Sequence, residues 1–172
     1  MDEKEQILYM QTRLSRTASE KWGKSMADVI NIYSQYNVLE YIESCYEIFH
    51  VQGDEANFED IENYLRTAVH QSSPSGEIER PVLFPFAEGY RCPAIHEELS
   101  GMEVTEELIK NTMDLLAAMA AADIAADLEI SNTQALKGLL SSRTGRMLYD
   151  KETKLWWDGP AAIADLYEKE IA

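Results

Sequence analysis

The stretch ISNTQALKGLLSSRTGRMLYDKETKLWWDGPAAIADLY, residues 130–167, carries the densest set of structural signals in the chain. Ser131 precedes a run of apolar residues at helical spacing, as expected of a helix N-cap. The polar run DKET at 150–153 predicts a turn, LWW at 155–157 an apolar segment, and Pro160 the first turn of a last helix. The stretch therefore predicts a small helical unit.

The same order of signals occurs in the first half of the chain. A long helix is followed by a polar cap at Ser25, short apolar segments, a glycine turn at Gly53 and a closing helix. In the second half Ser131 and Gly159 take the corresponding places. Few residues are identical, so chance similarity of helical units is the alternative. We expect a duplication in which the two halves superpose.

These patterns predict an all-α fold made of two related units. The first unit covers residues 1–70 and the second covers 104–172, with a linker and Pro-rich arm at 71–103 between them. The prolines of the arm exclude a long helix. Its apolar residues, Phe84 and Phe86 among them, fit either an irregular arm packed on the core or an exposed docking segment.

Three local expectations concern the first unit. A helix should run from Lys4 to Trp22 and end at Gly23, where a left-handed backbone suits glycine. The segment CYEIFHV, residues 45–51, is rich in aromatic and β-branched residues, which favours an extended conformation and a minor β-hairpin. Asn57 is placed to cap the closing helix of the unit.

The longest helix should begin after Thr105, a suitable N-cap. We expect its apolar residues to form one buried stripe: Leu108, Leu115, Leu116, Met119 and Ile124. Its many alanines favour helix and would let a neighbouring helix approach closely.

Composition limits the function. The chain has 172 residues, 31 acidic and 15 basic, and a net charge of -16. From Glu40 to Glu129 the only bases are Arg66, Arg80, Arg91 and Lys110. This charge argues against direct binding of nucleic acid, whose phosphates require a Lys/Arg surface. Without a long apolar run or a signal-peptide pattern, and with only two cysteines, we expect a cytoplasmic protein that does not enter membranes.

No motif in the sequence indicates catalysis. The chain lacks a G-x-S-x-G elbow, a phosphate-binding glycine loop and a metalloprotease helix. Cys45 and His50, with Cys92 and His96, do not have the tight paired spacing of structural zinc ligands. We expect no enzymatic activity, no cofactor and no metal site.

Both halves resemble a small, mostly helical bacterial domain of unknown function. The resemblance rests on NVLEYIESCYEIFHVQGDEANFEDIENYL, residues 37–65, and on SSRTGRMLYDKETKLWWDGPAAIADLY, residues 141–167. The Pro-rich arm departs from the single-domain pattern. Genes of this family often lie beside genes for ADP-ribosyltransferase-like proteins, which implies an accessory or antitoxin-like role. No catalytic residue is carried over.

The leading hypothesis is a non-enzymatic inhibitor or antitoxin-like protein that sterically blocks a basic partner protein, either a toxin or a nucleic-acid-binding effector. The candidate contact residues are six acids with three aromatic anchors: Glu40, Glu43, Glu47, Asp54, Glu55 and Glu59, with Tyr41, Tyr46 and Trp157. One alternative is a phage-encoded nucleic-acid mimic, of anti-CRISPR or anti-restriction type, whose carboxylates stand in for phosphates. The other is a homo-oligomeric scaffold, for instance a homodimer.

Overall fold

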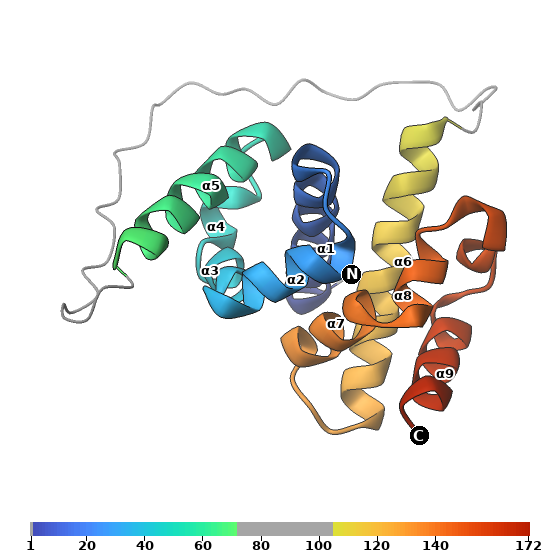
Figure 1. Ribbon diagram of the computed structural model, residues 1–172. Helices are drawn as coiled ribbons and strands as arrows, with labels where there is room; N and C mark the ends of the chain where they lie inside the picture. Colours follow the sequence, from blue (N-terminus) through green and yellow to red (C-terminus); the bar gives the residue numbers. More distant parts are fainter. Residues whose placement is uncertain (1, 72–104) are drawn as a thin grey trace.

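The computed structural model describes residues 2–71 and 105–172, and these two ranges contain helices and no strand. The first half forms α1 (Glu3–Trp22), α2 (Met26–Gln35), α3 (Val38–Ser44), α4 (Tyr46–Phe49) and α5 (Asp54–Gln71). The second half forms α6 (Glu106–Asp127), α7 (Asn132–Ser141), α8 (Arg143–Leu148), η1 (Lys151–Thr153), η2 (Leu155–Trp157) and α9 (Pro160–Ile171), where η marks a 3-10 helix. The prediction of an all-α fold is confirmed (Figure 1).

Helix ends follow the capping signals of the sequence. Gly23 ends α1 in the left-handed conformation, with φ of 60°. The hydroxyls of Ser25, Thr105 and Ser131 accept the backbone N–H three residues on, which starts α2, α6 and α7. These four local predictions are correct because each depends on one side chain and its adjacent backbone.

The predicted extended segment at 45–51, and with it the minor β-hairpin, is wrong. Tyr46–Phe49 forms α4, in which the N–H of Phe49 donates to the carbonyl of Cys45 at 3.0 Å. The turn follows α3 directly and lets Phe49 enter the core, where the ring of Tyr41 meets it edge-on at 5.9 Å. Burial of one aromatic side chain here outweighs the β propensity of the segment, which is a weak local preference.

Asn57 does not cap a helix. Because α5 already begins at Asp54, Asn57 lies inside its first turn and is 2% exposed. Its Nδ2 donates to the carbonyl oxygen of Phe49 at 2.9 Å, which ties the start of α5 to the end of α4.

The buried face of α6 is rich in alanine and also contains Met113 and Asp114. Ala117, Ala118, Ala120 and Ala121 are buried together with Ile124. Of the residues expected in a buried stripe, only Ile124 is fully buried. Leu115 and Leu116 are half-buried, whereas Leu108 and Met119 are exposed. The alanines allow α1, α7 and α9 to pack closely around α6, and Leu108 and Met119 point away from these helices.

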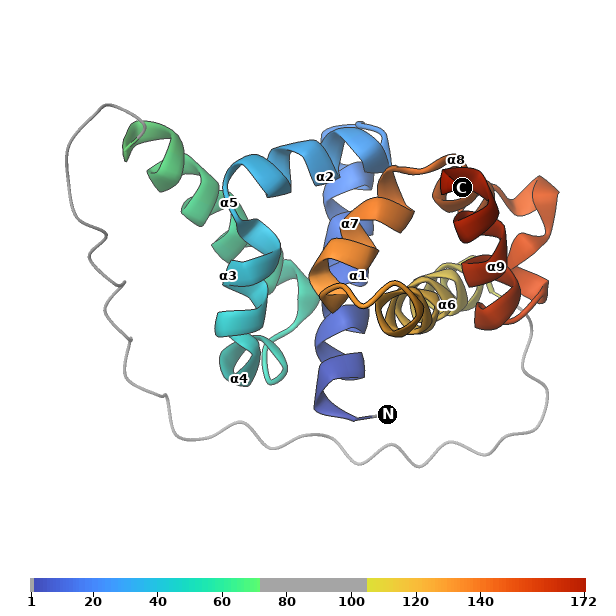
Figure 2. The same ribbon diagram turned by 90° about the horizontal axis from the view of Figure 1, so that it is seen from below.

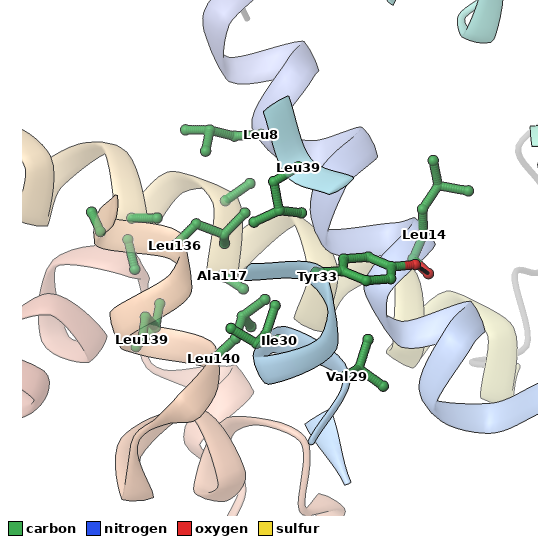
Figure 3. Close-up of a cluster of buried hydrophobic side chains, with 14 of the residues drawn as sticks. Leu8, Leu14, Val29, Ile30, Tyr33, Leu39, Ala117, Leu136, Leu139 and Leu140 are labelled. Atoms are coloured by element: carbon green, nitrogen blue, oxygen red, sulfur yellow. Dashed lines mark hydrogen bonds between the residues drawn. The ribbon is translucent and has the colours of Figure 1, made fainter. Parts of the chain in front are cut away.

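One hydrophobic core joins the two halves. Its side chains come from α1 to α5 on one side and from α6, α7, α8, η2 and α9 on the other, and Figure 3 shows the part around Leu14, Tyr33, Ala117 and Leu136. The principal contacts between the halves are α1 with α6 and α2 with α7. The domain boundaries at 70 and 104 stay predictions, and the arm at 72–103 lies outside the described residues.

The two halves share an order of elements. Each has a long helix, a ten-residue helix capped by serine, short helical segments and a closing helix that follows a glycine. The closing helices differ, since α5 has 18 residues and α9 has 12. The duplication and the superposition of Ser25 on Ser131 stay predictions.

Candidate functional site

The six acidic candidates all belong to α3, α4 and α5, which form one end of the molecule (Figures 1 and 2). We call this surface, made of Glu40, Glu43, Glu47, Asp54, Glu55 and Glu59, the acidic end. All six side chains are exposed. The structure therefore places on one region of the surface a set of carboxylates spread over twenty residues of sequence.

Half of these carboxylates are engaged within the chain. Glu40 pairs with Lys137 of α7, with 2.6 Å between Oε1 and Nζ. Asp54 pairs with Arg13 of α1, and Glu55 pairs with Lys21 of the same helix. These three ion pairs connect the acidic end to α1 and α7. The carboxylates of Glu40, Asp54 and Glu55 are therefore not freely available to a partner.

The other three acids, Glu43, Glu47 and Glu59, form no ion pair with any residue that the structure describes. The negative charge of Glu59 acts on the neighbouring carboxylate of Asp60. Partial burial raises the pKa of Asp60, and the adjacent Glu59 carboxylate raises it further. Negative charge is thus left without a balancing cation on this surface, which is the arrangement that attracts cationic groups from solution.

The aromatic candidates Tyr41 and Tyr46 are held by contacts within the first half. Tyr41 is half-buried and stacks on Tyr64, with ring centroids 4.1 Å apart and an angle of 9° between the planes. The hydroxyl of Tyr46 donates to Oε1 of Gln6 at 2.6 Å, and its ring stacks on His50. Tyr41 therefore supports the acidic end from beneath, whereas Tyr46 stays partly open to solvent.

Trp157 is not brought together with the other candidates. It belongs to η2, on the opposite side of the molecule from α3, α4 and α5 in both views (Figures 1 and 2). Its side chain is 72% exposed and meets Trp156 edge-on at 5.4 Å.

A groove adjoins the acidic end between α1 and the corner of α4 and α5. It has a volume of about 190 Å³ and is lined by Gln6, Tyr9, Met10, Arg13, Tyr46, Phe49, His50, Gln52, Asp54 and Asn57. Among these residues, only Tyr46 and Asp54 were named from the sequence as candidate contact residues. Arg13 lies over the ring of Tyr9 and pairs with Asp54, so its charge is already neutralised.

Asn57 gives this groove an unsatisfied acceptor. Its amide nitrogen is committed to Phe49, and its Oδ1 has no hydrogen-bond partner among the described residues. A buried acceptor of this kind calls for an N–H or O–H donor from outside the chain, whether water or a bound group. The sequence held no signal for it, because an asparagine ahead of apolar residues is more typical of a helix cap.

A second hollow, of about 360 Å³, lies where α1 meets the start of α7, and Glu43 borders it. Gln11 also lines it. Gln11 is buried, donates from Nε2 to the carbonyl of Leu39 at 2.8 Å, and leaves its Oε1 without a partner in the part of the chain that the structure describes. The acidic end therefore has a hollow on either side, each lined by a residue whose buried amide oxygen has no partner among the described residues.

A buried ionic cluster lies apart from the acidic end, between the two halves. Asp114 of α6 is fully buried and accepts from Nε of Arg16 at 2.8 Å and from the hydroxyl of Tyr149 at 2.9 Å. Burial raises the pKa of Asp114, against the opposing effect of Arg16 and Tyr149. Sequence reasoning missed this cluster, although an aspartate inside the apolar run of α6 was a usable signal of a buried partner.

Two further observations bear on chemistry. Within residues 2–71 and 105–172, no group of three or more His, Cys, Asp or Glu side chains is arranged to hold a metal ion. None of the helices in these ranges has both the length and the apolar character needed to cross a membrane. What the acidic end and its hollows offer is a set of carboxylates and amide oxygens, which can accept hydrogen bonds and pair with cations.

Comparison with known proteins finds one similarity, which covers about a third of the chain. Residues 10–68, from α1 to α5, match a family model described as "Protein of unknown function (DUF3791)". No curated protein matches the chain, and no solved structure does. The region that carries the acidic end is thus similar to a small domain of unknown function.

Proposed function

We propose that this chain is a non-enzymatic inhibitor, antitoxin-like in its action, that binds a basic partner protein through the acidic end. The observation that carries the proposal is the set Glu43, Glu47 and Glu59, exposed and without an ion pair in the described residues. Such unbalanced charge costs stability through mutual repulsion, and a cationic partner would relieve it.

The expected partner chemistry follows from the groups on this surface. Carboxylates at the acidic end attract Lys and Arg side chains over a distance of about a Debye length, roughly 8 to 10 Å at physiological salt. The N–H groups of Lys and Arg are suitable donors to these carboxylate oxygens. Inhibition would be steric, because a helical surface of this size can cover a functional site of the partner.

The test compares two variants that change net charge equally. The acidic-end variant carries Glu43→Lys, Glu47→Lys and Glu59→Lys. The matched control carries Glu152→Lys, Asp158→Lys and Asp165→Lys, three exposed acids of the second half without an ion pair in the described ranges. Partners are captured from the native host with the immobilised wild-type chain. Their association rates are then measured with all three chains at low and high salt.

We expect the acidic-end variant to associate at least about tenfold more slowly than wild type at low salt, and the difference to shrink at high salt because screening removes the steering. The control should keep nearly wild-type rates. Equal slowing of both variants would mean that only net charge matters. If the acidic-end variant associates at wild-type rates, the acidic end does not bind the partner.

A second measurement separates the proposed inhibitor from a nucleic-acid mimic and a scaffold. The activity of the captured protein is measured with and without the chain, and DNA or RNA is added as a competitor. Loss of activity without competition supports the inhibitor. Displacement of the chain by nucleic acid identifies a mimic, and capture of the chain alone identifies a scaffold.

A further inference from the structure

The solvent-facing side of α6 is apolar along almost its whole length. It consists of six residues at alternating spacings of four and three, namely Leu108, Thr112, Leu115, Met119, Ala122 and Ala126, which we call the α6 seam. Leu108 is 37% and Met119 is 40% exposed. A surface helix normally places polar residues on the side away from the core, so this apolar side is unusual.

The position of α6 explains which side is open. In Figure 2, which views α6 nearly along its axis, α1 and α9 lie on either side of it and α7 lies above it. The buried alanines of α6 face these helices. The α6 seam lies on the opposite side, where Leu108, Met119 and Ala126 are exposed and Thr112, Leu115 and Ala122 are half-buried.

The charge along the seam contrasts with that of the molecule. The chain has a net charge of -16, yet Asp123 is the one charged residue that directly flanks the seam over its central turns. A spacing of four and three is the pattern by which two helices interlock side chains along a shared line. The seam thus has both the composition and the spacing of a helix-pairing surface.

We propose that two copies of the chain associate through the α6 seam, with the two helices antiparallel. In this arrangement Leu108 of one copy faces Ala126 of the other, Thr112 faces Ala122, and Leu115 faces Met119. Each of the larger residues at one end then meets a small residue at the other, as close packing requires.

Charge favours the antiparallel direction. The C-terminal end of α6 carries Asp123, Asp127 and Glu129, and partial burial together with the charges of Asp127 and Glu5 raises the pKa of Asp123. A parallel pair would bring these acids of both copies together. The antiparallel pair places them beside the N-terminal end, where Glu106 pairs with Lys151, Glu107 lies 3.9 Å from Arg16, and the helix dipole is positive.

The size of the seam sets the strength of the association. A helix of 22 residues is about 33 Å long, and one helix face of this length offers less area than the roughly 800 Å² per partner of a standard stable interface. We therefore expect a reversible dimer that forms between about 10 and 500 µM. This inference does not depend on the proposed function, because the acidic end stays open in the dimer.

The test is analytical ultracentrifugation of the full chain over that concentration range. Wild type should shift from monomer to dimer. Met119→Lys should lower the association constant at least tenfold, since it places a charge in the middle of the seam. Val51→Lys, an equal change at an exposed apolar residue outside α6, should leave the association constant unchanged. Circular dichroism checks that both variants remain helical.

Orientation is tested by disulfide cross-linking. Chains with Leu108→Cys and chains with Ala126→Cys are oxidised separately and as a mixture, with wild type as the background for Cys45 and Cys92. A cross-linked dimer that forms only in the mixture supports the antiparallel pair. A cross-link in Leu108→Cys alone indicates a parallel pair and overturns the orientation. A wild-type chain that stays monomeric throughout, or a dimer insensitive to Met119→Lys, overturns the proposal.

Discussion

At the scale of single residues, Gly145 shows helix propensity and packing acting in opposite directions. It lies within α8, where alanine would be favoured over glycine by roughly 1 kcal/mol. A Cβ at this position, however, would collide with the backbone carbonyl of Leu139. Because backbone cannot move aside as a side chain can, we expect Gly145→Ala to destabilise the chain by about 1–3 kcal/mol.

Urea denaturation of wild type and variant measures this effect. The matched control is Gly53→Ala, because nothing lies within 4 Å of a Cβ added there. The control should lose much less stability than Gly145→Ala, because only the preference for glycine over alanine ahead of α5 is lost. A gain in stability for Gly145→Ala would show that α8 can move away from Leu139.

Single residues were the part of the site that sequence predicted least well. The acidity of Glu43, Glu47 and Glu59 is visible in the sequence, but the pairing of Asp54 with Arg13 is not. Ion pairs between α1 and α5 depend on how the two helices cross, and their partners are 41 residues apart. The sequence therefore predicted which residues are charged, and only the fold determines which of those charges remain unpaired.

At the scale of elements, α8 depends on a residue of another helix. The carboxylate of Glu170 in α9 accepts from the N–H groups of Arg143 and Thr144, at 2.7 and 2.8 Å, and thereby completes the N-terminus of α8. Burial acts to raise the pKa of Glu170, but these hydrogen bonds, with that of the Thr144 hydroxyl, outweigh it and hold the pKa below its usual value.

A carboxylate whose pKa is lower in the folded chain contributes stability at a pH above its unfolded pKa, and this contribution is lost as the pH falls through the folded pKa. We expect Glu170→Gln to cost about 1 kcal/mol at pH 7, the usual worth of a helix cap, and less at pH 3. Urea denaturation at both pH values measures the difference. The control is Glu152→Gln, at an exposed acid with no side-chain partner in the described ranges, and its effect on stability should not depend on pH. A loss of stability for Glu170→Gln that is equal at pH 7 and pH 3 would contradict the capping role.

Elements were predicted well wherever local signals determine them. The caps at Ser25, Thr105 and Ser131 and the end of α1 at Gly23 follow from neighbouring residues alone. The conformation of residues 45–51 and the buried face of α6 do not follow from neighbouring residues, because both depend on which helices pack against them. In α6 the close approach of neighbouring helices favours alanine at most buried positions, and Leu108 and Met119 are exposed.

At the scale of the whole molecule, the two halves are joined by an ion pair as well as by the shared core. Arg16 of α1 is 8% exposed, and it donates to Asp114 of α6, which is fully buried. Tyr149, which follows α8, donates to the other carboxylate oxygen of Asp114. The cluster thus connects three helices from both halves at a place where water cannot replace a lost partner.

Removing one charge of the Arg16–Asp114 pair should therefore lower the free energy of unfolding far more than removing both charges. Asp114→Asn removes the one buried counter-charge of Arg16 and leaves it only the more exposed Glu20 and Glu107, for which we expect a loss of about 3 kcal/mol, the lower end of the range for a broken buried pair. Arg16→Met combined with Asp114→Leu removes both charges and should lose much less than the sum of the single variants. Urea denaturation of the single and double variants gives the coupling energy.

The control cycle uses Arg13 and Asp54, whose side chains are 33% and 45% exposed, and its coupling energy should stay below about 1 kcal/mol. Equal coupling in the two cycles would mean that Arg16 and Asp114 behave as a surface pair, and that the hydrophobic core alone holds the halves together.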